Sequence, residues 1–235
     1  MAAPITPDGF PTDLATNVAW ARAGTAFFLD AVAALSDDEL DAPSALPDWT
    51  RRYVCAHVAR NAEGLSRLLD WAKTGVENKM YPSPEAREAG IAASSTAAAA
   101  DLRADLISAS EAFLRDCDAM PAGSWQATVA TMLRPIPAVV VPWYRVREVW
   151  IHAADLGASV GFSDFPLDVC EALVTELATG LGNREGADLH LTSSETGREW
   201  LIGAGTTRVE ARSGELAEWL TGRTTRPEVE LPAWI

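Results

Sequence analysis

Hydrophobic residues along the first two-thirds of the chain recur at intervals of three and four, the spacing of one face of an α-helix. Asp13 is a suitable N-cap for the first of these segments, and Gly75 and Gly157 follow the ends of two others. Long amphipathic helices joined by loops indicate a helix bundle. The four predicted helices run from about residue 13 to 35, 50 to 73, 97 to 120 and 138 to 156.

Prolines mark two places where this helical pattern changes. Pro82 and Pro84 predict a loop after the second helix, and the alanine-rich stretch at 92–100 is interpreted as a loop that leads into the third. Pro142 must lie in the first turn of the fourth helix or kink that helix, because proline lacks the backbone N–H donor.

Beyond Gly161 the pattern becomes shorter and mixed. A helix is expected from about residue 167 to 179, then three short strands, then a last helix from 214 to 221. The predicted fold class is therefore mainly α: a helix bundle over residues 1–160, followed by a small α/β (α+β) C-terminal domain over residues 161–235. The strands are predicted at residues 189–192, 200–202 and 208–211.

Charge and cysteine content exclude several classes of protein. The net charge is −14, and the 19 lysines and arginines are scattered, so neither nucleic acid nor a membrane surface is an expected partner. The sequence contains neither a signal-peptide pattern at its start nor an uncharged apolar run long enough to span a membrane, which favours a cytoplasmic location. Three widely spaced cysteines are not a disulfide framework and fit a reducing compartment.

Histidine and glutamate residues supply the candidate chemistry. Glu148 and His152 are four residues apart, so they differ by about 40° around the helix axis and project from one face. His57 lies on the apolar stripe of the second predicted helix, from which it can meet that pair across a bundle interior. Two imidazoles and one carboxylate suit a catalytic zinc with an open coordination position, although iron and manganese are also compatible.

Simpler interpretations of the same residues stay open. A buried histidine is often a satisfied core residue, and a Glu–His pair at this spacing is a common helix-surface pair. Asn61 lies one turn after His57 and can orient a ligand, touch the substrate or complete the bundle interior. Cys55 is about 200° around the helix from His57, which predicts a packing cysteine. His190 alternates with apolar neighbours and is expected at a surface or interface.

Four segments resemble the mycothiol-dependent maleylpyruvate isomerase family, which lies within the DinB-like metal-binding helical bundles. The segments around His57 and His152 are characteristic of the superfamily. The segment at residues 80–87 points to the isomerase family itself. The resemblance covers nearly the whole chain and implies a DinB-like four-helix bundle followed by a C-terminal domain. The segments are residues 48–62 and 145–157, then 80–87, then 232–235.

The resemblance implies roles for individual residues. His57, Glu148 and His152 would be the ligands of a divalent metal, with zinc expected. It also implies an essential arginine from the C-terminal domain, which matches Arg223, with Arg226 as an alternative. A solvated surface arginine is the simpler interpretation of Arg223.

The implied activity is the cis–trans isomerisation of maleylpyruvate to fumarylpyruvate in gentisate degradation. The chain offers no convincing catalytic cysteine, so mycothiol would supply the thiol and an arginine would bind the anionic substrate. Three alternatives stay open: a mycothiol S-transferase acting on other electrophiles, a metal-binding or regulatory bundle without turnover, and a bare structural bundle. No sequence feature indicates an oligomeric state.

Overall fold

The computed structural model describes residues 4–183, 187–226, 229 and 231, which divide into two compact units. One unit comprises Asp13–Val160, and the other joins the residues from Gly161 onward with the segment that precedes Asp13. This N-terminal segment was expected in the bundle. It belongs to the C-terminal unit instead, where Gly9 lies tightly against Thr179.

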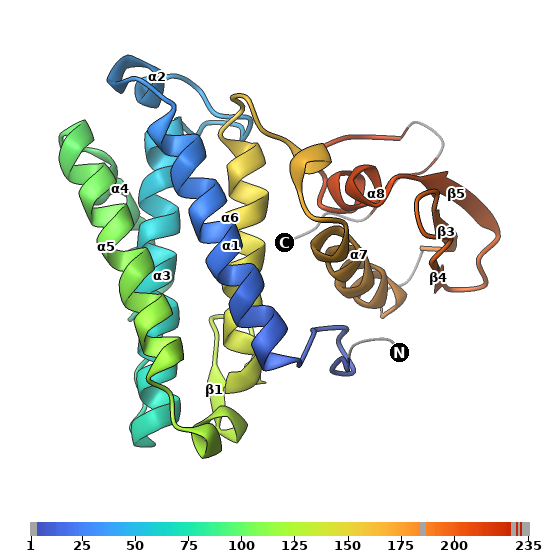
Figure 1. Ribbon diagram of the computed structural model, residues 1–235, viewed down its shortest axis with the longest axis horizontal. Coiled ribbons are helices and arrows are strands. Elements are labelled where there is room, and N and C mark those ends of the chain that lie inside the picture. Colours follow the sequence, from blue (N-terminus) through green and yellow to red (C-terminus); the bar gives the residue numbers. More distant parts are fainter. Residues whose placement is uncertain (1–3, 184–186, 227–228, 230, 232–235) are drawn as a thin grey trace. The chain divides into compact units, whose positions relative to one another are not determined.

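Long helices dominate the first unit, as predicted, and Figure 1 shows them running alongside one another. The helix α3 packs against both α5 and α6, and α1 packs against α6 and α5. Aromatic and aliphatic side chains such as Phe28, Leu65, Phe113 and Trp143 are fully buried between them. Burying each such side chain contributes about 1.5–3 kcal/mol. The helices are α1 (Leu14–Ala33), α3 (Arg51–Thr74), α5 (Ala99–Asp118) and α6 (Val141–Asp155).

Several predicted helix boundaries agree with the local chemistry at those ends. The carboxylate of Asp13 accepts a hydrogen bond of 2.8 Å from the Thr16 N–H and so caps α1. Gly75 and Gly157 adopt φ angles of 75° and 61°, the left-handed conformation that ends a helix. Pro142 lies in the first turn of α6, behind the short 3-10 helix η2 (Ala138–Val140), so α6 has no interior proline to kink it.

The segment after α3 differs from the expected loop. It contains α4 (Pro84–Ser95), which packs against α3 and buries Ile91. Ser83 caps this helix by accepting a 3.1 Å hydrogen bond from the Ala86 N–H. Pro84 occupies the first helical position, where its missing N–H costs nothing, so the proline starts a helix here instead of preventing one.

Shorter elements complete the first unit. The helix α2 (Asp37–Asp41) is closed by a capping box between Ser36 and Glu39. After α5, the 3-10 helix η1 leads into an antiparallel pair of strands. These elements are η1 (Ala122–Gln126), β1 (Thr128–Ala130) and β2 (Pro135–Pro137).

The C-terminal unit is the small mixed α/β module that the sequence predicts. Its three-stranded sheet has the order β4-β3-β5, in which β3 is antiparallel to β4 and parallel to β5. Leu189 and Leu191 are buried, and the indole N–H of Trp200 donates a 2.9 Å hydrogen bond to the Thr175 hydroxyl on α7. The elements are η3 (Phe162–Asp164), α7 (Leu167–Gly182), β3 (Leu189–Ser193), β4 (Glu199–Ile202), β5 (Thr207–Ala211) and α8 (Ser213–Leu220).

Two further sequence-based expectations concern membrane-spanning helices and the C-terminal segment. Among the described residues, no helix is both long enough and apolar enough to cross a membrane. The terminal segment 232–235, which contributed to the family resemblance, lies outside the described residues.

Candidate metal centre

His57, Glu148 and His152 meet inside the helix bundle. His57 comes from the second turn of α3, and the other two come from successive turns of α6, the helix that packs against α3. One ligand atom from each residue lies within 4.8 Å of the others. Glu148 Oε2 is 2.8 Å from His57 Nε2 and 3.3 Å from His152 Nε2. The juxtaposition predicted from the spacing of these residues is therefore present.

Their exposure distinguishes the three side chains. The side chain of His57 is 7% exposed and that of His152 is 13% exposed, whereas that of Glu148 is 23% exposed. Trp49 covers part of the cluster, because its ring lies 5.4 Å from the His57 ring and 6.4 Å from the His152 ring. The centre is thus mostly withdrawn from water but remains accessible at the carboxylate.

Burial and charge act in opposite directions on the three titratable groups. Burial favours a high pKa for Glu148, but the charge of His57 and hydrogen bonds from both histidines hold that pKa well below its ordinary value. Burial lowers the pKa of His57 despite the nearby Glu148 carboxylate. Burial also opposes the charged form of His152, yet hydrogen bonds to Asp155 and Glu148 raise its pKa to about 9. The cluster therefore keeps Glu148 ionised, as a metal ligand must be.

Asp155 supports the centre from behind His152. Its carboxylate Oδ2 lies 2.8 Å from His152 Nδ1, and the residue is only 1% exposed. This carboxylate holds the proton on Nδ1 and leaves Nε2 facing Glu148, an arrangement common behind metal-binding histidines. Sequence reasoning missed this role, although the i,i+3 spacing from His152 along α6 was visible.

Arg87 contacts the centre from α4. Its guanidinium Nη2 lies 3.1 Å from His57 Nδ1, and its Cζ lies 5.8 Å from the centre of the Tyr81 ring. Burial, together with the charge of Glu148, raises the pKa of Tyr81 to about 12. Both residues belong to the 80–87 segment singled out by the resemblance, but neither received a role from the sequence.

The sequence and the fold both match one family. A family model for the N-terminal domain of mycothiol maleylpyruvate isomerase matches residues 21–157, more than half of the chain. The chain belongs to this family.

Solved structures extend the similarity beyond the N-terminal domain. A crystal structure of the mycothiol-dependent maleylpyruvate isomerase is 31% identical, with a TM-score of 0.85, and the match covers 93% of this chain and 95% of that chain. A crystal structure of a histidine-to-alanine mutant described under the same enzyme name is 30% identical, with the same TM-score and coverage. No match was found among proteins of curated function.

Asn61 lies in a buried polar network one turn beyond His57. Its Oδ1 accepts a 3.2 Å hydrogen bond from Nη1 of Arg145, a fully buried arginine. Arg145 also donates to the Val58 carbonyl at 2.7 Å and to the Ser110 hydroxyl at 2.9 Å. Burial lowers the pKa of Arg145 to about 10. These contacts tie α6 to α3 and α5 directly beneath the histidines, whereas a cofactor-binding role for Asn61 stays a prediction.

Arg223, Arg226 and His190 belong to the C-terminal unit. Arg223 Nη1 donates a 2.7 Å hydrogen bond to the Thr221 carbonyl, and the Arg226 guanidinium lies 5.4 Å from the centre of the Trp219 ring. An approach of either arginine to the metal centre stays a prediction. His190 Nε2 lies 3.3 Å from Glu199 Oε1, on the opposite face of β3 from its leucine neighbours, as expected.

The three cysteines are unsuited to act as nucleophiles. Cys55, Cys117 and Cys170 are free and buried. Burial raises the pKa of each thiol to about 12, far from the range in which a thiolate forms at neutral pH. This agrees with the packing role expected from the sequence.

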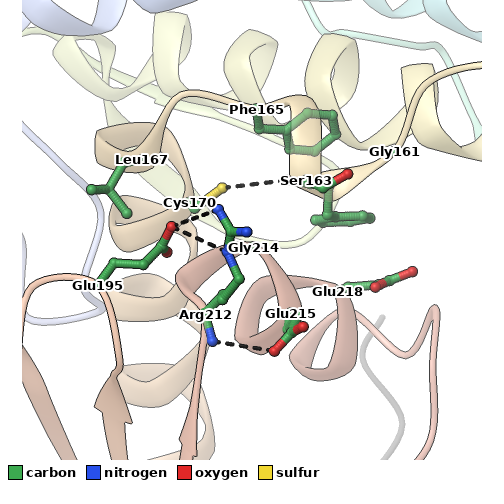
Figure 2. A pocket seen from close by; sticks show the side chains of 11 residues that line it. Gly161, Ser163, Phe165, Leu167, Cys170, Glu195, Arg212, Gly214, Glu215 and Glu218 are labelled. Carbon is green, nitrogen blue, oxygen red and sulfur yellow. Dashed lines mark hydrogen bonds and ion pairs between the residues drawn. The ribbon is translucent and has the colours of Figure 1, made fainter.

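A separate cavity of about 330 Å³ lies within the C-terminal unit and is shown in Figure 2. Phe162 and Phe165 supply apolar lining, and Arg212 pairs with Glu195 at 3.0 Å along its wall. The described lining contains no residue predicted to act in catalysis or metal binding. The cluster in the bundle is therefore the better candidate for the functional centre.

Proposed function

We propose that this protein is a thiol-dependent cis–trans isomerase that converts maleylpyruvate to fumarylpyruvate, a step of gentisate degradation, with mycothiol as the thiol. The observation that carries the proposal is the convergence of His57, Glu148 and His152 in a chain of this family. The similar solved structures, whose titles name this mycothiol-dependent enzyme, support the choice of reaction and thiol.

The donor set fits a divalent metal. Two imidazole nitrogens and one carboxylate oxygen are a usual zinc ligand set, and three protein ligands leave a position for an exogenous group. In the proposal His57, Glu148 and His152 hold the metal, and zinc is the expected ion. A divalent cation held there supplies positive charge that favours the thiolate form of a thiol, whose ordinary pKa is about 8.5.

The thiol must come from outside the chain, because all three cysteines are buried with raised pKa values. The thiolate adds to the conjugated double bond, and the electron pair moves onto the neighbouring carbonyl to form an enolate. The former double bond is now single and rotates. The enolate then expels the thiolate and restores the double bond in the trans geometry, so the thiol is regenerated.

The protein groups around this reaction bind and stabilise negative charge. An arginine from the C-terminal unit, Arg223 with Arg226 as the alternative, holds a substrate carboxylate in the proposal and stabilises the enolate. Trp49 shields the histidines from water, which strengthens electrostatic interactions at the centre.

Metal content and activity, measured on the same samples, test the proposal. We expect one zinc per wild-type chain, loss of that zinc in His57→Ala, and isomerisation of maleylpyruvate only when mycothiol is added. Activity would be followed by chromatographic separation of the cis and trans acids. Arg223→Ala and Arg226→Ala are compared in the same assay, and the variant that loses activity identifies the arginine that binds the substrate.

Other outcomes separate the alternatives. Turnover of model electrophiles with mycothiol, without turnover of maleylpyruvate, would replace the isomerase by an S-transferase. Metal binding without thiol-dependent turnover of any substrate would favour a binding or regulatory protein. A wild-type protein that binds no divalent metal would contradict the proposed centre.

A further inference from the structure

The two histidines of the centre have opposite partners on their outer ring nitrogens. His152 Nδ1 faces the Asp155 carboxylate at 2.8 Å, whereas His57 Nδ1 faces the Arg87 guanidinium at 3.1 Å. An ionised carboxylate only accepts hydrogen bonds, and a guanidinium only donates them. The outer nitrogen of His152 therefore faces a hydrogen-bond acceptor, whereas the outer nitrogen of His57 faces a donor.

Each proton position has a consequence for metal binding. Asp155 accepts a hydrogen bond from His152 Nδ1, which is the proton position that ligation through Nε2 requires. Arg87 donates to His57 Nδ1, so a neutral His57 carries its proton on Nε2 and points it at Glu148 Oε2, 2.8 Å away. His152 thus already has the outer partner that suits a metal ligand, whereas His57 does not.

Ligation through His57 Nε2 is incompatible with the Arg87 contact. The proton must then lie on Nδ1, where it would face an N–H of Arg87, so that two donors would oppose each other. The positive charge of a cation at the centre would also repel the guanidinium. Either His57 fails to bind through Nε2, or Arg87 leaves it.

The surroundings of Arg87 allow it to leave. Its side chain is 27% exposed, and it projects from α4, an element of the same unit as the three ligands. Arg87 Nη1 forms an ion pair of 3.7 Å with Glu88 Oε2, while Oε1 of that carboxylate accepts a hydrogen bond from the Tyr53 hydroxyl. Release from His57 therefore frees Nη2, the guanidinium nitrogen that can bind another anion.

We propose that filling the metal centre releases Arg87 from His57, and that the released guanidinium binds a carboxylate of the substrate. The inference rests on the proposed function, in which His57 is a ligand and the substrate is an anion. Maleylpyruvate carries a carboxylate at each end, and the arginine expected from the C-terminal unit accounts for one of them. Arg87 binds the other carboxylate. Because Arg87 is released only when the centre holds a metal, substrate binding depends on metal binding.

Zinc affinity of the metal-free protein provides the first test, measured by competition with a chromophoric chelator. Arg87→Met removes the contact that competes with ligation, so the zinc Kd should fall by about 3- to 10-fold. A residue that merely supported the fold or the ligands would give the opposite sign. Arg115→Met, which changes an exposed arginine on α5, is the matched control and should leave the Kd unchanged.

Kinetics of the zinc-loaded enzyme provide the second test. Arg87→Met should raise the KM for maleylpyruvate about tenfold or more, because a charge-assisted hydrogen bond to a carboxylate is lost. Arg87→Lys keeps the charge and should recover part of that loss. Circular dichroism of each variant confirms that the bundle is folded.

The outcomes separate this inference from the function on which it rests. A wild-type protein that binds no zinc would overturn both. Zinc binding by the wild type, combined with weaker zinc binding in Arg87→Met or with an unchanged KM, would overturn the role of Arg87 alone and leave the isomerase proposal standing.

Discussion

At the scale of single residues, the neighbours of the two histidines matter as much as the histidines. His57 and His152 are chemically identical side chains, yet one faces a guanidinium and the other a carboxylate. These partners decide how readily each ring keeps a proton on Nδ1 and hence how readily it binds a metal through Nε2. Asp155 and Arg87 should therefore have opposite effects on metal affinity.

Asp155→Ala tests the favourable partner. The variant removes the acceptor that holds the His152 proton on Nδ1, so we expect zinc affinity to fall by about 10- to 100-fold. Asp155→Asn keeps an acceptor oxygen but loses the charge, and its affinity should lie between those of the wild type and the alanine variant. Isothermal titration with zinc measures all three, and equal affinities would remove Asp155 from the centre.

At the scale of elements, the position of α6, which carries Glu148 and His152, is fixed by helix packing on two of its sides. The packing of α3, α5 and α6 is reinforced by Arg145 on α6, which donates hydrogen bonds to the Val58 carbonyl on α3 and the Ser110 hydroxyl on α5. On the other side, α1 approaches α6 closely at Gly24, where an added Cβ would lie 2.5 Å from Val149 Cγ2 and from Trp150 Nε1. Val149 and Trp150 are buried neighbours of Glu148 along α6, so they have little room to move.

Gly24→Ala should therefore destabilise the protein by about 1–3 kcal/mol, the usual cost of overpacking a core. Gly90→Ala is the matched control, because Gly90 also lies in a helix but an added Cβ would meet nothing within 4 Å. That change should stabilise the protein by up to about 1 kcal/mol through the higher helix propensity of alanine. Urea unfolding of both variants measures the difference, and equal effects would contradict the close packing of α1 on α6.

At the scale of the whole molecule, the residues that the proposed function uses are divided between two units. The three candidate ligands, Asp155 and Arg87 all lie within Asp13–Val160, whereas Arg223 and Arg226 belong to the C-terminal unit. The net charge of −14 would oppose the approach of the anionic substrate that we propose, so binding it would require cationic groups at the centre. Because all three candidate ligands belong to the helix bundle, metal binding should stabilise the bundle directly.

Zinc added to the metal-free protein should raise its unfolding temperature. At a free concentration of 100 times the Kd, a ligand that binds only the folded state contributes about 2.7 kcal/mol. If the two units unfold separately, the shift should appear in the transition of the bundle. Calorimetry with and without zinc measures it. The His57→Ala variant should not respond, and an equal response in that variant would place the zinc elsewhere.

The sequence by itself determined the helices of the bundle, the small mixed module and the shared face of Glu148 and His152. These features follow from local rules, namely the helical period, capping residues and strand alternation, which act within a few turns of chain. Where a local signal was ambiguous, as with Pro84, the expected loop proved to be a helix that packs on α3.

Only the tertiary structure decided which groups surround the ligands. His57 is 91 positions from Glu148 and 30 from Arg87 along the chain, so no local pattern specifies their contacts. Helix packing brings them together, because α4 and α6 both bury apolar side chains against α3. The period of the sequence therefore identifies the ligand-bearing faces and places Asp155 one turn from His152, whereas the packing of the helices brings Glu148 and Arg87 to His57.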